Sequence, residues 1–174
     1  MRDIGLLATR SVLGGYLAVH GAQKLFGSFG GPGLDATATG FEALGIRPGK
    51  VMALAAGASE FGGGVLTVTG VAAPLGPLAI AGAMVVATAV HRKQGPMAQK
   101  QGFELPLTNL AVAIGLISSG SGRWVLGPRL PTSLARIAVV AGTAMAAGSL
   151  VQLLRAKPAT KVAATAETAD VASS

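Results

Sequence analysis

The chain has 174 residues, of which 51% are hydrophobic and only 12% are charged. An average soluble domain has roughly 25% charged residues, so this chain carries too few charges to cover a soluble surface. It contains no cysteine, which excludes disulfides, cysteine-ligated metal sites and iron–sulfur clusters. This composition favours a small integral membrane protein.

The formal net charge is +7, and the basic residues lie between apolar segments. Lysine and arginine in such loops bind anionic headgroups and orient membrane helices. A protein that binds nucleic acid would instead place aromatic side chains among its basic residues, because the bases stack on them. Only 4% of the residues are aromatic. Membrane lipid is therefore the expected partner, and nucleic acid is not.

The N-terminal part of the chain predicts three membrane-spanning helices. A span needs about 20 apolar residues to cross roughly 30 Å of hydrocarbon. In the long apolar stretch after residue 50, Pro74 and Pro77 end one helix and start the next, because proline does not fit a helix interior. A Gly/Pro-rich connection over residues 27–49 has room for a short helix around Ala36–Leu44. The expected spans are Ile4–Phe26, Val51–Val71 and Leu75–Val90.

Two further apolar stretches follow, Leu105–Gly122 and Ile137–Leu154, and neither contains a charged residue. Both are close to the lower length limit of a span. The last residues, rich in alanine and threonine, predict a disordered tail. We therefore expect an all-α protein with a transmembrane four-helix bundle over 1–122. An interfacial loop and an additional C-terminal transmembrane helix follow over 123–155, and the tail occupies 156–174.

Ionisable residues inside the first span are candidate site residues. Each costs about 2.5–3.5 kcal/mol at the bilayer centre, so such side chains usually face a bundle interior or a cavity. On a helix, Arg10, His20 and Lys24 lie within about 80° of one direction and form a cationic stripe. Gly14 and Gly21 share this face, and such small residues let a neighbouring helix approach closely.

Glu60 lies in the second span on a stripe of small residues that includes Gly57 and Gly64. The natural partner of its carboxylate is the cationic stripe of the first span. Two interpretations are about equally supported. The cluster either binds a polar headgroup or relays protons, or it is a structural ion pair that fixes the register of two helices. Glu104 is a further carboxylate candidate, and it would complement the N-terminus of the fourth span.

No sequence motif assigns a metal, a cofactor or a catalytic residue. His20 and His91 lack the spacing of a helical zinc motif, so no metal ligand set is predicted. The glycines at 62–64 lie inside an apolar span and indicate helix packing, not a phosphate-binding loop.

Three motifs in order carry a family resemblance: HGAQKLFG at 20–27, AGASEFGG at 56–63 and GFE at 102–104. Together with Arg10, they resemble the signature of the DoxX family of small bacterial membrane proteins, over roughly Ile4–Gly122. The resemblance maps His20, Lys24, Glu60 and Glu104 onto polar positions of the family.

The resemblance implies a four-helix transmembrane bundle in the bacterial inner membrane. It also implies an oxidoreductase, or the membrane subunit of a quinone-linked redox system. Because the chain has no haem or flavin motif, electron transfer would need a partner. The candidate partners are a quinone, soluble redox enzymes and other membrane subunits. Two alternatives stay open: a non-catalytic scaffold that anchors partner proteins, and a membrane protein that binds a small solute or a lipid headgroup near Arg10 and Glu60.

Overall fold

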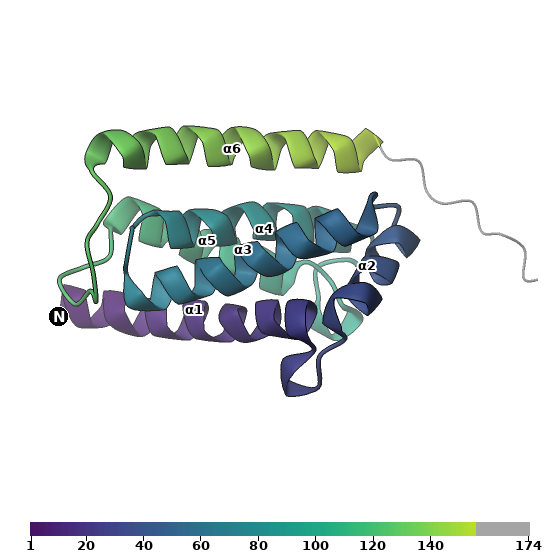
Figure 1. Ribbon diagram of the computed structural model, residues 1–174, viewed down its shortest axis with the longest axis horizontal. Coiled ribbons are helices and arrows are strands. Elements are labelled where there is room, and N and C mark those ends of the chain that lie inside the picture. The colour runs from purple at the N-terminus through teal and green to yellow at the C-terminus, as the bar shows by residue number, and fades with distance from the viewer. Residues whose placement is uncertain (156–174) are drawn as a thin grey trace, which may run out of the picture.

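The computed structural model describes residues 1–155, and for six residues of its last helix it describes the backbone alone. This part of the chain is all-helical (Figure 1). The predicted tail over 156–174 lies outside the described residues. The α-helices are α1 Arg2–Phe26, α2 Gly33–Ala43, α3 Gly49–Thr69, α4 Leu75–His91, α5 Glu104–Ser119 and α6 Thr132–Arg155.

The helix boundaries follow from glycine and proline. α1 and α3 end at Gly27 and Gly70, which adopt left-handed conformations with φ of 69° and 71°. Glycine is favoured at this position because it has no Cβ to clash there. Pro48 and Pro74 directly precede α3 and α4. The predicted helical hairpin is confirmed, but its break lies at residues 70–74, and Pro77, expected in the break, lies in the first turn of α4, where proline is tolerated. The short helix in the Gly/Pro-rich connection is also confirmed.

Four of the helices form a bundle in which α1 packs along α3, α3 on α4, α4 on α5, and α5 against α1. α2 lies across one end of α3, and α6 runs along the outside of the bundle against α4 (Figure 1). The apolar core is built from α1, α4 and α5. Its buried members are Leu13, Leu17, Ile80, Ala81, Met84, Ala113 and Leu116.

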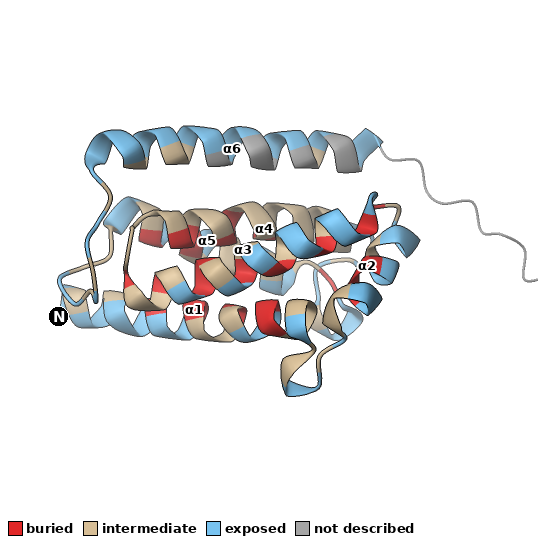
Figure 2. Ribbon diagram, viewed as in Figure 1, coloured by how far each residue is buried: buried red, intermediate tan, exposed pale blue. Residues whose placement is uncertain are grey.

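A helix of a water-soluble protein buries its large apolar residues, and α3 does the opposite. It exposes Val51, Leu54, Phe61 and Val65. The buried positions, which face the other helices in Figure 2, hold small or polar residues: Gly49, Ala53, Gly57, Glu60, Gly63, Gly64 and Thr67. This distribution is favourable when hydrocarbon surrounds the bundle, because apolar side chains then face apolar solvent.

Two helical segments are long and apolar enough to cross a membrane by length and composition, Gly49–Thr69 and Leu75–Gln94, the second of which includes the turn after α4. α5 has 16 residues, which corresponds to about 24 Å and is shorter than a typical hydrocarbon core. The structure therefore confirms helices at all five predicted span positions. That these five helices cross a membrane stays a prediction, which length and composition support for α3 and α4.

Candidate functional site

The site is built on the close contact between α1 and α3. A Cβ atom on Gly14 would lie 2.6 Å from the carbonyl oxygen of Gly64, and one on Gly21 would lie 2.7 Å from that of Gly57. Real Cβ atoms do not approach backbone this closely, so α1 needs glycine at both positions. The four glycines that the sequence pattern selected thus lie together in one helix contact, where α1 and α3 run antiparallel.

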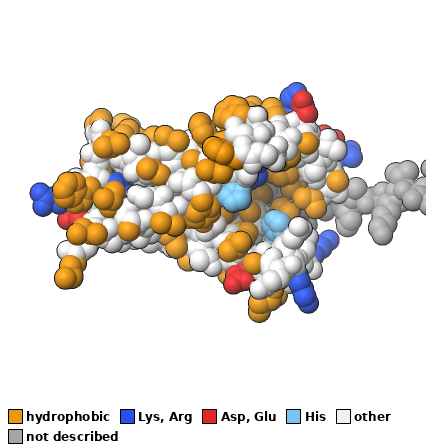
Figure 3. Space-filling model, turned by 90° about the horizontal axis from the view of Figure 1, so that it is seen from below, with side chains coloured by type: hydrophobic (Ala, Val, Ile, Leu, Met, Phe, Trp, Pro, Cys, Tyr) orange, Lys and Arg blue, Asp and Glu red, His pale blue; other side chains and the backbone are white. Residues whose placement is uncertain are grey.

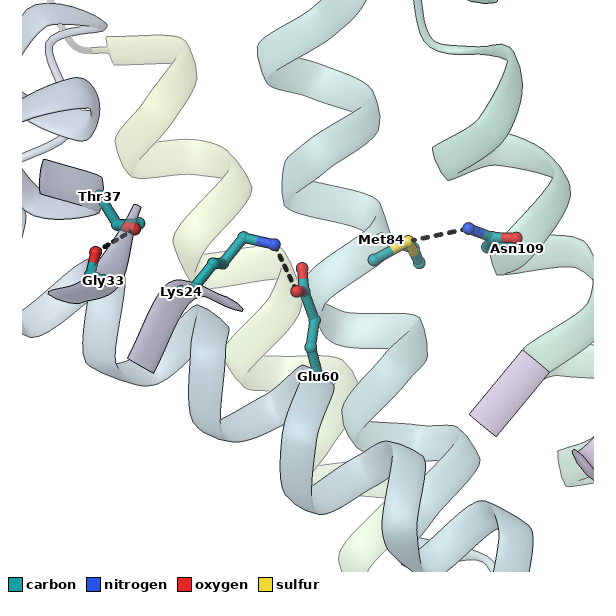
Figure 4. A network of polar contacts seen from close by, with 6 residues as sticks. All are labelled: Lys24, Gly33, Thr37, Glu60, Met84 and Asn109. Carbon is teal, nitrogen blue, oxygen red and sulfur yellow. Dashed lines mark hydrogen bonds and ion pairs between the residues drawn. The ribbon is translucent and has the colours of Figure 1, made fainter. Parts of the chain in front are cut away.

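Lys24 and Glu60 form an ion pair across this contact (Figure 4). The Lys24 Nζ donates a hydrogen bond to Glu60 Oε2. The side chain of Glu60 is 8% exposed and that of Lys24 is 25% exposed, so the carboxylate lies inside the bundle and the ammonium reaches its margin. The pair therefore neutralises a buried acid, which would otherwise be costly in an apolar bundle.

Arg10 belongs to the predicted cationic stripe, but the structure places it at the other end of α1. Lys24 follows Arg10 by fourteen residues, which corresponds to about 21 Å along the helix axis. Arg10 is buried, and its Nη2 donates to the backbone carbonyl of Trp124. It is therefore outside the reach of Glu60, and the stripe divides into two separate sites.

His20 also lies outside the Lys24–Glu60 pair. Its side chain is exposed, and its ring meets Tyr16 edge-on at a centroid distance of 6.0 Å. His20 lies at the edge of the stripe, which is why neighbouring helices leave it uncovered. Figure 3 shows both histidines on the same face of the molecule. The other one, His91, hydrogen-bonds through Nδ1 to the Gln101 carbonyl at 2.7 Å.

Glu104 is exposed and is the first residue of α5. Its Oε2 accepts a hydrogen bond from the Ala98 N–H at 3.0 Å, so the side chain holds the preceding loop. It lies in the first turn of α5, as the sequence predicts, where a carboxylate complements the positive end of the helix. Its described contact is to this loop and not to the Lys24–Glu60 pair.

A second polar connection, which the sequence patterns did not predict, lies in the middle of the bundle. The hydroxyl of Tyr16 donates to Asn109 Oδ1, and Asn109 Nδ2 donates to Met84 Sδ at 3.8 Å (Figure 4 shows the latter contact). It joins α1, α5 and α4. A signal was available, because Asn109 is the only asparagine of the chain and stands in an uncharged apolar segment. Side chains of this kind hydrogen-bond between membrane helices.

The Lys24–Glu60 end of the contact thus holds one ion pair inside the bundle. His20, one turn earlier on α1, is an accessible imidazole at the surface. Over residues 1–155, no group of three or more histidine, cysteine, aspartate or glutamate side chains is placed to hold a metal ion.

Comparison with known proteins assigns the family. The model of the DoxX family matches residues 5–92, about half of the chain, which includes nearly all of α1 and the whole of α2, α3 and α4. The match therefore covers Arg10, the glycine contact and the Lys24–Glu60 pair. No curated protein and no solved structure matches the chain. The chain thus belongs to the DoxX family and is a membrane protein.

Proposed function

We propose that this protein crosses the bacterial inner membrane several times and acts as the membrane subunit of a quinone-linked redox system. Its family, its apolar exterior and its two long apolar helices support the membrane location. Helices at the other predicted span positions support several crossings.

The Lys24–Glu60 pair is the observation that carries the redox part of the proposal. Reduction of a quinone takes up protons together with electrons, so a quinone site in a bundle needs an acid–base group away from bulk water. Glu60 supplies the carboxylate, and Lys24 stabilises its charged form. His20, exposed at the same end of α1, is the candidate proton carrier between the surface and this pair.

The electrons come from a partner in this proposal. The chain contains no cysteine, and the sequence holds no motif for haem or flavin, so the redox cofactor belongs to a soluble enzyme or another membrane subunit. The role of this chain is to hold the quinone in the membrane and to exchange its protons.

The test measures reduction of a quinone analogue by membrane vesicles from cells in which a variant is the only copy of the protein. We expect Glu60→Gln to slow reduction by at least about 100-fold, the lower range for loss of an acid–base group. His20→Ala should slow it less, because water can replace a surface proton carrier. Asp35→Asn is the matched control, since it removes the carboxylate of an exposed ion pair with Lys50.

The second candidate is a non-catalytic scaffold, in which the pair only fixes the register of α1 against α3. It is favoured by the direct contact of Lys24 with Glu60, because each side chain satisfies the charge of the other. A folded Glu60→Gln variant that still reduces the quinone analogue at the wild-type rate would contradict the redox proposal and favour this role.

A further inference from the structure

A cavity of about 260 Å³ lies at the opposite end of the bundle from the Lys24–Glu60 pair. It is bounded by α1, α3, α4, α5 and the beginning of α6, and Arg10 and Arg129 both line it. None of its lining residues is acidic. The volume is below the roughly 300–1,000 Å³ of pockets that hold drug-sized ligands, so a single headgroup fits better than a whole lipid.

Arg10 is the first feature that points to an anion. It is 2% exposed, and its Nη2 donates to the Trp124 carbonyl. Its Nε and Nη1 have no hydrogen-bond partner within the part of the chain that the structure describes. A guanidinium stays charged in proteins and carries five N–H donors. Burying this charge with donors unsatisfied is costly, and an anion in the cavity would lower the cost by neutralising the charge.

The glycine at the end of α3 leaves room for this guanidinium beside the cavity. Gly70 lines the cavity, and a Cβ atom at this position would collide with Arg10 Nη1. The unpartnered nitrogen therefore lies over a backbone position that has no side chain.

Two further positive features border the same space. Arg129 is exposed at its mouth and donates through Nη2 to the Gly122 carbonyl. α6 begins here, with Thr132 and Ala135 in the lining. The first N–H groups of a helix lack intrahelical partners and favour anions. An anion would offset the repulsion between the two arginines.

We propose that this cavity binds the phosphate group of an anionic ligand, with Arg10 and Arg129 as its two cationic contacts. Arginine matches phosphate because two of its N–H groups can bind two oxygens at once. Apolar lining residues such as Leu66, Leu116 and Leu130 suit the glycerol and first methylenes of a phospholipid. The phosphate belongs either to an anionic phospholipid or to free inorganic phosphate. This site is independent of the proposed redox function.

The test uses the full chain, purified in an uncharged detergent without phosphate. Trp124 is the only tryptophan, and its carbonyl contacts Arg10, so its fluorescence reports on this end of the bundle. The protein is titrated with short-chain phosphatidylglycerol, with short-chain phosphatidylcholine and with inorganic phosphate.

We expect phosphatidylglycerol to bind at least about tenfold more tightly than phosphatidylcholine, because the choline cation opposes the two arginines. Arg129→Gln should weaken anion binding about tenfold, as expected for loss of a charge-assisted contact. Arg10→Gln should weaken it at least as much. Arg123→Gln is the matched control and should bind as the wild type does, since Arg123 is an exposed neighbour that does not line the cavity.

The outcomes separate the two sources of phosphate. Tight binding of phosphatidylglycerol alone assigns a lipid, and competition by inorganic phosphate assigns the free anion. Equal binding of phosphatidylglycerol and phosphatidylcholine, with no effect of inorganic phosphate, would overturn the proposal. So would wild-type anion binding by a folded Arg129→Gln variant, which decides the question even if Arg10→Gln fails to fold, because Arg129 is exposed. The binding measurements do not depend on quinone reduction, so this proposal and the proposed redox function can fail separately.

Discussion

The cationic side chains at the two ends of α1 have opposite surroundings. At one end, Glu60 neutralises Lys24 across the α1–α3 contact. At the other, Arg10 meets the carbonyl of Trp124 and a second arginine, Arg129, beside a cavity. At the first end the protein itself supplies the counter-charge. At the second end, in our proposal, a bound anion supplies it. A buried cation thus indicates a site most strongly where the chain does not pair it.

The first prediction separates α1 from α3 and thereby disturbs both ends. In Gly64→Ala, the new Cβ would lie 2.6 Å from the backbone nitrogen of Ala18. Backbone cannot give way as a side chain can, so we expect a loss of about 3 kcal/mol in the free energy of unfolding. Thermal unfolding followed by circular dichroism in detergent measures this.

Gly62→Ala is the control on the same helix, because a Cβ at Gly62 meets nothing within 4 Å. Alanine favours helix, so this variant should unfold at or slightly above the wild-type temperature. Equal destabilisation by Gly62→Ala and Gly64→Ala would contradict the close contact as the cause.

The second prediction removes the carboxylate that compensates the charge of Lys24. Glu60→Gln leaves Lys24 without its carboxylate. Breaking a buried pair costs about 3–5 kcal/mol, and partial exposure of Lys24 should reduce this to about 2 kcal/mol. Chemical unfolding measures the loss. The double variant Lys24→Gln/Glu60→Gln should recover most of it.

The matched control for this pair is Asp35→Asn, which breaks the exposed Lys50–Asp35 pair of 3.0 Å. Exposed pairs contribute little, so a loss below about 0.5 kcal/mol is expected. If the double variant were less stable than Glu60→Gln alone, the unpaired lysine would not be the source of the loss.

The third prediction tests the polar connection in the middle of the bundle, which lies between the two ends. Tyr16→Phe removes the hydroxyl that donates to Asn109 and should cost about 1 kcal/mol, the usual net value of one hydrogen bond. The unfolding midpoint in detergent reports it. Thr9→Val is the control, because Thr9 bonds only its own helix at an exposed position. A Tyr16→Phe variant as stable as Thr9→Val would show that this bond adds nothing.

The smallest effect is expected for removal of the Arg10 charge, which no acidic residue in the cavity lining compensates. Arg10→Gln in uncharged, phosphate-free detergent loses the bond to Trp124 but also removes a buried charge with unsatisfied donors. These terms oppose each other, so we expect a change within about 1 kcal/mol in unfolding free energy. A loss as large as that of Glu60→Gln would contradict the contrast between the two ends.

Much of the fold could be predicted from local sequence. Pro74 and Pro77, near the start of α4, together with the apolar runs placed all five long helices, because proline and glycine act on the backbone where they stand. Helical periodicity placed Gly14 and Gly21 on one face of α1 and Gly57 and Gly64 on one face of α3, and the structure brings the two faces into one contact. It did not indicate Asn109, because the candidate site residues were chosen among ionisable side chains and asparagine carries no charge.

The sequence by itself determined the family, the helices and the face of α1 that carries its cations. It could not determine which cation meets Glu60. Helical periodicity gives the angle of a side chain around its own helix axis, but not its position along the axis relative to a neighbouring helix. Only the antiparallel register of α1 and α3 brought Lys24 to Glu60. The same register left Arg10 beside Gly70, where a loop and α6 from the far end of the chain complete a cavity that no local pattern encodes.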